Sequence, residues 1–236
     1  MPQESPISHI LKNLPLEYHD PWWRNSRILN LIEKLEIDLD NKNTLDLGCA
    51  QGWLERSLFE RGITNSKIQG WDHVDIRAEE RNYREKWIHK ILDLSKNWPI
   101  DEKFDTIFAL EVIEHMIDTD HFLENCKKIS ANNGHIIFST PNIASLRSRL
   151  KLLFGKYPDA MEYRNVIHHV RMYTVPTIKS HLESHNYEVI KCIGVNFLPM
   201  NLHKFSLLRN LSNILANRFP SLCNNIILVT KVKSDF

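Results

Sequence analysis

The stretch TLDLGCAQG, residues 44–52, decides the fold that this sequence predicts. Its first half, residues 44–48, is a short apolar run that ends at a glycine, as a buried strand does. Residues 52–62 then read as a helix that stops at Gly62. A strand that turns into a helix through small residues leaves free N–H groups at the helix start. In open α/β sheets, ligands bind at this end of the strands. The stretch therefore predicts a ligand-binding loop in an α/β protein.

Strands and helices alternate outward from this loop. Further strands are expected near 68–71, 87–92, 104–110, 135–140, 187–194 and 225–232, and helices near 26–36, 118–130, 176–185 and 203–217. Strands separated by helices indicate a parallel sheet that is covered on both faces. We predict a doubly wound, mostly parallel sheet of seven strands. Residues 142–172 interrupt the pattern as an irregular insertion, which contains the basic amphipathic piece SLRSRLKLLFGK.

We expect one domain over residues 1–236. Its predicted parts are an N-terminal helical cap over 1–40, a ligand-binding core over 41–140, an insertion over the active site at 141–173, and the C-terminal half of the sheet at 174–236. Three aromatic residues, Tyr18, Trp22 and Trp23, are expected before the first helix, either over the ligand or on the sheet edge. The apolar and basic segment 202–222 is expected to pack in the core or in a homodimer.

The composition narrows the class of protein. Lys and Arg total 30 against 29 Asp and Glu, for a net charge of +1, which disfavours nucleic acid as a partner. The four cysteines form no C-x-x-C pair, so no structural zinc site or disulfide framework is indicated. We read no signal peptide and no apolar run long enough for a transmembrane helix. We therefore expect a cytoplasmic protein.

Acidic residues follow three successive predicted strands. Asp46 precedes the first glycine of the loop, Asp72 ends the strand IQGWD, and Asp93 follows WIHKILDL. A carboxylate beside the loop would repel a pyrophosphate, and the loop lacks the G-x-G-x-x-G pattern of a dinucleotide site. The same carboxylates suit a cationic ligand. An ordinary tight turn is the alternative for the loop, and a turn or a helix cap is the alternative for Asp72.

The loop resembles the first motif of class I S-adenosylmethionine (SAM)-dependent methyltransferases, an acidic residue followed by G-x-G-x-G. The resemblance covers residues 40–140 well and continues more loosely to 195. Ala50 replaces the middle glycine, which is tolerated if its backbone does not need a positive φ. The resemblance implies that the methionine end of SAM is held by Asp46, Gly48, Ala50 and Gly52. It also implies that Asp72 holds the ribose hydroxyls and that Asp93 with Leu94 holds the adenine. Glu111 is a further candidate for cofactor binding.

The segment ALEVIEHMID, residues 109–118, carries the candidate catalytic groups. Glu111, Glu114 and His115 are spaced so that one helical turn would place them on one face. The segment resembles ubiquinone-pathway O-methyltransferases and small-RNA 3′-terminal 2′-O-methyltransferases, some of which bind a divalent metal through such residues. His169 resembles the later histidine of the RNA enzymes. We expect His115, His169 and Glu114 to act in catalysis without a metal. A divalent metal held by Glu111, Glu114, His115 and His169 is the alternative, as are structural roles for these side chains.

The function predicted is a SAM-dependent methyltransferase that acts on a small molecule and leaves S-adenosylhomocysteine. We expect the acceptor to be a hydroxyl oxygen on a glycan precursor, a lipid or a specialised metabolite. Basic residues of the insertion would meet an acidic acceptor or form a solvated helix face: Arg147, Arg149, Lys151 and Lys156. The alternatives are RNA 3′-terminal 2′-O-methylation, a non-catalytic partner protein with the SAM fold, and an NAD-dependent oxidoreductase.

Overall fold

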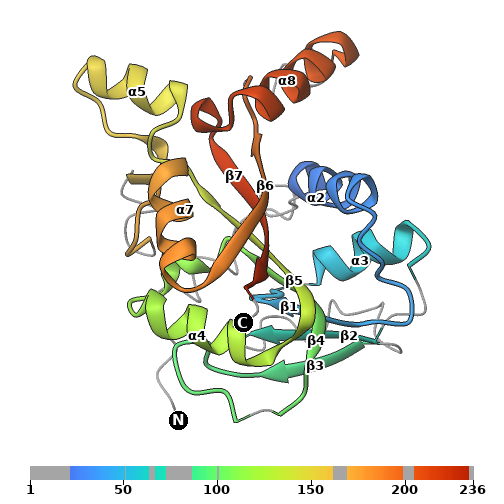
Figure 1. The fold of residues 1–236 in the computed structure, drawn as a ribbon. Coiled ribbons are helices and arrows are strands. Elements are labelled where there is room, and N and C mark those ends of the chain that lie inside the picture. Colours follow the sequence, from blue (N-terminus) through green and yellow to red (C-terminus); the bar gives the residue numbers. More distant parts are fainter. Residues whose placement is uncertain are drawn as a thin grey trace, which may run out of the picture.

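Seven strands form one sheet in the order β3-β2-β1-β4-β5-β7-β6. The computed structural model describes residues 22–50, 52–63, 67–72, 87–99, 101–161, 169–198 and 205–233. The strands are β1 Asn43–Leu47, β2 Lys67–Asp72, β3 Trp87–Ile91, β4 Phe104–Leu110, β5 Ser130–Pro141, β6 Tyr187–Val195 and β7 Asn225–Val232. Strands β1 to β5 pair in parallel, and β7 runs antiparallel to both of its neighbours. The prediction of a doubly wound, mostly parallel sheet of seven strands is confirmed (Figure 1).

Helices cover both faces of the sheet (Figure 1). They are α2 Trp22–Lys34, α3 Trp53–Glu60, α4 Thr119–Ile129, α5 Leu146–Leu153, α7 Val175–Ser184 and α8 Ser206–Arg218. Short 3-10 helices span Ile113–His115, Asp159–Met161 and Pro220–Leu222. Helices α2 and α3 lie on one side of the sheet, and α4 and α7 on the other. Among the described helices, none has the length and apolar character needed to cross a bilayer.

Successive side chains of each strand point to opposite faces of the sheet and so form two hydrophobic cores. In β4, Ile107 packs in the cluster under α4 and α7, whereas Phe108 packs in the cluster under α2 and α3. Leu45 and Leu47 of β1 belong to the first cluster. The residue between them, Asp46, therefore points to the opposite face, toward α2 and α3. The fold thus buries a predicted site residue beside these helices.

The structure corrects several local expectations. Helix α2 begins at Trp22, so Trp22 and Trp23 belong to the helix rather than preceding it. Tyr18 and the side chains of these tryptophans lie outside the described residues. Strand β5 begins at Ser130, earlier than predicted. The insertion is not wholly irregular, because α5 forms within it after Ser145, whose hydroxyl accepts a hydrogen bond from the backbone N–H of Ser148.

The segment 202–222 does not form a core helix over its described part. Helix α8 buries Ser212 and Ala216 and half-buries Leu208 and Leu215, whereas its other large apolar side chains face outward. Exposed examples are Leu207, Leu211 and Ile214. Both α5 and α8 project from the body of the protein (Figure 1). Core packing is thus found on one side of α8, and the exposed apolar side leaves the alternative of a homodimer open.

Candidate functional site

The loop after β1 is built from left-handed backbone. The φ angles are +71° at Gly48, +44° at Ala50 and +76° at Gly52. A Cβ atom added at Gly48 would lie 2.6 Å from Cγ2 of Val112, so this position requires glycine for packing as well as for conformation. The backbone N–H of Gly48 donates to the carbonyl oxygen of Trp71 at 2.7 Å. The loop is thereby fixed at the carboxyl end of the parallel strands.

Ala50 has a positive φ. From the sequence, alanine is expected to be tolerated here only if the backbone does not need one. An alanine in this region costs roughly 1–2 kcal/mol. Its backbone N–H donates to Oδ2 of Asp72 at 2.9 Å, which offsets part of this cost. Asp72 is buried at the end of β2. This carboxylate therefore ties the end of β2 to the glycine loop.

Asp46 and Glu55 form a buried pair of carboxyl groups. Asp46 lies on the face of β1 toward α3, and Glu55 lies in the first turn of α3. Burial first, and then the charge of Glu55, raise the pKa of Asp46 well above its usual range. Burial raises the pKa of Glu55 to about 7. A hydrogen bond joins the two side chains, and the charge of Arg24 opposes the rise at Asp46. The pair therefore retains a proton near neutral pH.

Sequence reasoning missed Glu55. An acid in the first turn of a helix normally stabilises the helix from the surface. Here Glu55 lies on the buried side of α3 with Leu54 and Leu58. The carboxylate has room because β2 carries Gly70: a Cβ there would lie 2.8 Å from Oε1 of Glu55. The glycine in the strand IQGWD was the signal that another group approaches closely.

Asp93 and Leu94 follow β3. Oδ1 of Asp93 accepts hydrogen bonds from the backbone N–H and the hydroxyl of Ser95, at 2.9 and 2.6 Å. Leu94 is buried in the core cluster with Trp71 and Trp98. The exposed carboxylate of Asp93 thus stands on a fixed turn with an apolar wall beside it. The predicted roles of both residues toward adenine stay predictions.

Glu111 is held at the end of β4 with a φ of +57°. Its Oε1 accepts from the hydroxyl of Ser139 at 2.7 Å, and its Oε2 accepts from Nδ2 of Asn225 at 2.9 Å. Nη1 of Arg24 lies 3.9 Å from Oε1. The helical turn begins only at Ile113. Glu111 therefore stands outside the turn that carries Glu114 and His115, and the predicted single face of three residues is not formed.

Glu114, His115 and His169 come together although His169 is distant in sequence. One ligand atom of each lies within 4.8 Å of the others, and the two imidazole rings are 5.0 Å apart. The carbonyl oxygen of Glu114 accepts from the backbone N–H groups of Val170 and Arg171, at 2.9 and 3.0 Å. These two bonds bring the last part of the insertion to the end of β4.

Within this cluster the three side chains differ in environment. Glu114 is 1% exposed, and neither of its carboxyl oxygens makes a hydrogen bond of ordinary geometry within the described chain. Burial and the neighbouring charge of Glu111 raise the pKa of Glu114 well above its usual range. His115 is exposed, and Nδ1 of His169 lies 3.3 Å from the carbonyl oxygen of Ala160. One carboxylate and two imidazoles also suit a divalent transition metal. The predicted fourth ligand, Glu111, is not among the grouped atoms.

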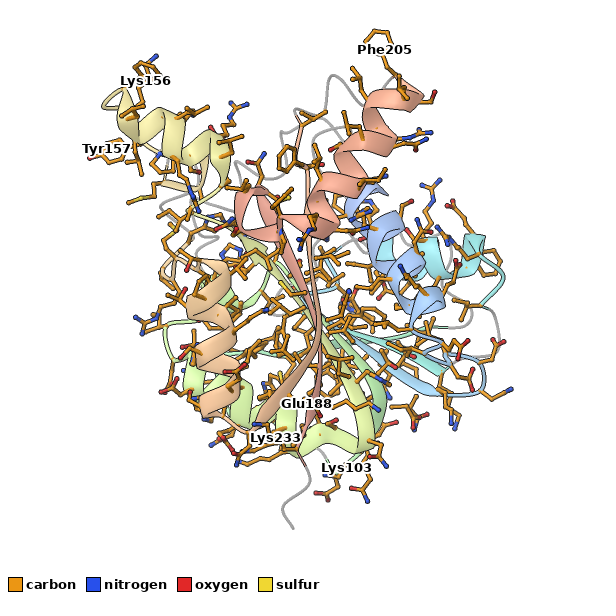
Figure 2. All side chains as sticks on the ribbon, turned by 45° about the horizontal axis from the view of Figure 1, so that its top comes forward. Lys103, Lys156, Tyr157, Glu188, Phe205 and Lys233 are labelled. Carbon is orange, nitrogen blue, oxygen red and sulfur yellow. The ribbon has the colours of Figure 1, made fainter. Side chains whose placement is uncertain are left out.

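Three of the four basic residues of the insertion are engaged locally. Arg147 and Lys151 both pair with Asp159, and Nε of Arg149 donates to the carbonyl oxygen of Ala144 at 2.7 Å. Figure 2 shows Lys156 at the far end of α5, away from the sheet. For Arg147, Arg149 and Lys151, the contacts support stabilisation of the insertion itself.

Comparison with known proteins identifies the family. Residues 22–192 match the family described as "Methyltransferase domain". The ubiquinone biosynthesis O-methyltransferase of Dictyostelium discoideum is 25% identical over 185 residues, which cover 70% of this chain and 56% of that protein. The corresponding protein of Rickettsia bellii is 24% identical over 208 residues, covering 85% of this chain and 84% of that protein. The chain thus spans little more than half of the Dictyostelium relative.

Solved structures share the fold at lower identity. A SAM-dependent methyltransferase from Clostridium acetobutylicum superposes with a TM-score of 0.61 at 13% identity, covering 95% of each chain. The N-methyltransferase NodS from Bradyrhizobium japonicum, in complex with S-adenosylhomocysteine, gives a TM-score of 0.57 at 15% identity, covering 94% of this chain and 93% of that one. SAM is the methyl donor of such domains, and S-adenosylhomocysteine is its product. The chain belongs to the class I SAM-dependent methyltransferases and is distantly related to the ubiquinone biosynthesis O-methyltransferases.

Proposed function

We propose that this chain transfers the methyl group of SAM to a hydroxyl oxygen of a small molecule. The observation that carries the proposal is the line of carboxyl groups at successive strand ends. Asp46, Asp72 and Glu111 lie at the ends of β1, β2 and β4, and Asp93 follows β3. Such a line attracts the sulfonium and ammonium groups of SAM. The names of the O-methyltransferase relatives support oxygen as the accepting atom.

Each end of the cofactor has candidate partners in this arrangement. We assign the methionine end to the loop of Gly48, Ala50 and Gly52, to the buried pair of Asp46 and Glu55 through Asp46, and to the charge of Glu111. We assign the ribose hydroxyls to Asp72, whose Oδ2 already orders the loop through the N–H of Ala50. The adenine is assigned to Asp93 and Leu94. Charge supports these assignments, and affinity measurements on variants test them.

His115 is the proposed base. When the acceptor oxygen forms its bond to the methyl carbon, the carbon–sulfur bond of SAM breaks and the sulfur becomes neutral. The acceptor loses its hydroxyl proton, and the exposed imidazole of His115 takes it up. His169 lies against that ring, and Glu114 lies behind it. Their proposed role is to orient the ring of His115.

A metal-assisted reaction is the second candidate, favoured by the grouping of Glu114, His115 and His169. In that case the ion would draw the acceptor oxygen to the site and lower its pKa. RNA as an acceptor is disfavoured by the net charge of +1. Apolar side chains are exposed on the insertion at Leu150, Leu153 and Phe154. They favour an acceptor with an apolar part, such as a lipid.

We also propose that the predicted division of the single domain holds, with a cap over 1–40, a cofactor core over 41–140, an insertion over 141–173 and a C-terminal half over 174–236. We propose as the partner a second copy of this chain, bound through the exposed apolar side of α8. Both are tested by limited proteolysis and by light scattering. Cleavage inside the core before the insertion would count against the division, and a monomer at all concentrations would exclude the dimer.

The reaction is tested with SAM labelled on its methyl group and a panel of phenols, quinols, glycan precursors and lipids. The proposal predicts labelled O-methyl products that wild-type protein forms and the His115→Gln variant forms far more slowly. The His121→Gln variant is the matched control, because His121 lies on α4 against Asn125 and outside the grouped residues. Methylation of nitrogen or carbon alone, or equal rates for the two variants, would overturn the proposal.

A further inference from the structure

A second cluster of ligating side chains lies outside the methyltransferase site, between α4 and α7. Nε2 of His181 lies 2.8 Å from Oδ1 of Asp120, and Nε2 of His185 lies 3.2 Å from the same oxygen. One ligand atom of each of these three residues lies within 4.8 Å of the others. Nδ1 of His185 lies 3.2 Å from Oε1 of Glu124. Two imidazoles therefore converge on one carboxylate, with a second carboxylate behind.

Helix geometry explains the convergence. His181 and His185 are four residues apart at the end of α7, and Asp120 and Glu124 are four residues apart on α4, so each pair shares one helix face. The two helices lie on the same side of the sheet (Figure 1). Phe122 and Leu123 of α4, together with Ile178 and Leu182 of α7, are buried in the same core cluster. The four polar side chains therefore project from two anchored helices.

The ring of His181 is oriented by its surroundings. The hydroxyl of Tyr173 lies 3.1 Å from Nδ1 of His181, and the two rings stack with an angle of 20° between their planes. This contact engages Nδ1 and directs Nε2 toward Asp120. A metal-bound histidine has the same arrangement, in which one ring nitrogen binds the ion and the other is held by a neighbouring group.

The exposure of the cluster suits an ion that enters from water. The side chains of His181 and His185 are 19% and 18% exposed, whereas Asp120 is 70% exposed. The imidazoles are thus set back between the helices and the carboxylate closes the open side. The histidine rings are 5.3 Å apart, so protonating both places two positive charges together. A metal ion needs the neutral rings and removes this repulsion.

We propose that Asp120, His181 and His185 form a binding site for a divalent transition metal, for which Zn²⁺ is the best match. Two histidines and one carboxylate, with a fourth position open to water, are a zinc ligand set. Atoms bound to a tetrahedral zinc at about 2.0–2.1 Å lie roughly 3.3 Å from one another. The observed distances of 2.8 and 3.2 Å from Asp120 to the imidazoles need only small side-chain rotations. Bound zinc ties α4 to α7, and Glu124 holds the second nitrogen of His185.

The test is a zinc titration by calorimetry after treatment with EDTA. All proteins carry His169→Gln, so that the cluster of Glu114, His115 and His169 is broken. We expect this background protein to bind one zinc per chain, with at least tenfold weaker binding after His185→Gln or Asp120→Asn. Asp120→Asn removes an exposed charge and leaves the packing intact. His135→Gln, at a partly buried histidine on β5 outside both clusters, is the control and should leave the affinity unchanged.

Two further readouts locate the ion. Co²⁺ should give the visible absorption bands of a four-coordinate, imidazole-bound ion in the background protein and lose them in Asp120→Asn. Zinc at about 100 times its Kd should raise the Tm of the background protein and leave that of His185→Gln unchanged. Absence of saturable zinc binding in the background protein would overturn the proposal. Equal affinity after both substitutions would do the same.

Discussion

The carboxyl group of Asp46 on β1 is hydrogen-bonded to the carboxyl group of Glu55 on α3, and both side chains are buried. Asp46 precedes the loop that begins at Gly48, and Glu55 lies in the first turn of the helix that follows this loop. Because their pKa values are raised, the folded protein still holds a proton on this pair at a pH where the unfolded chain has already released it.

The first prediction concerns the pH dependence of stability. The pKa of Glu55 rises from 4.5 to about 7 on folding, so the native state binds more protons between these values. The free energy of unfolding should therefore fall as pH rises through this window, by up to about 3 kcal/mol at 1.36 kcal/mol per pKa unit. Glu55→Gln should remove most of this fall. Urea denaturation at pH 5, 6, 7 and 8 measures it.

Glu60→Gln is the control for that series, because Glu60 is an exposed acid on the same helix. It should leave the pH slope of wild-type protein unchanged. If Glu55→Gln keeps the wild-type slope, the buried pair does not hold the proton assigned to it.

The second prediction concerns the backbone at Ala50. Ala50→Gly removes the strain of a positive φ but adds freedom to the unfolded chain, so the free energy of unfolding should change by less than about 1 kcal/mol. Ala50→Val should lower it by about 2 kcal/mol or more, because a β-branched side chain is a severe outlier there. Denaturation midpoints check both. Equal stability of the two variants would show that the loop does not hold this conformation.

The third prediction concerns His115. Its side chain is exposed, so His115→Gln should leave Tm and SAM affinity within error of wild type. Loss of the proton acceptor should lower kcat about 10²- to 10⁴-fold. The matched variant His121→Gln should keep the wild-type kcat. A fall in SAM affinity equal to the fall in turnover would instead mark His115 as a cofactor contact.

The fourth prediction separates the two candidate metal clusters. We expect methyl transfer by His115 to proceed at an unchanged rate in excess EDTA. The same EDTA should lower the Tm of protein that contains zinc, because ion binding between α4 and α7 stabilises only the folded state. Initial rates and melting curves on one preparation measure both. Loss of turnover in EDTA that Mg²⁺ or Zn²⁺ restores would favour the metal-assisted reaction.

The sequence predicted the sheet because most of its strands contain short apolar runs that end beside a glycine, an acid or a proline. The same pattern located Gly48, Asp72 and Asp93, whose positions depend only on where a strand ends. The condition set for Ala50, a backbone without a positive φ, is not met, because the loop follows the glycines around it rather than the preference of alanine. Because alanine occurs in all kinds of backbone, its residue type gives no sign that a position has a strained, positive φ.

Contacts between distant segments were harder to predict. The pairing of Asp46 with Glu55 depends on Gly70, which admits the carboxyl group from α3. The approach of His169 to Glu114 was expected from the family resemblance alone, because the backbone hydrogen bonds that produce it have no signature in residue type. The proposed zinc ligands Asp120 and His181 are 61 residues apart, and only the packing of α4 and α7 on one face of the sheet brings them together.

Calorimetric titration of the pure protein with SAM tests the central claim most directly. If acids at consecutive strand ends receive a cationic donor, SAM should bind in one-to-one ratio. Asp72→Ala should bind it at least tenfold more weakly, whereas Asp38→Ala, an exposed acid before β1, should bind as wild type does. Folded protein that takes up neither SAM nor S-adenosylhomocysteine would contradict the account, as would an Asp72→Ala variant with full affinity.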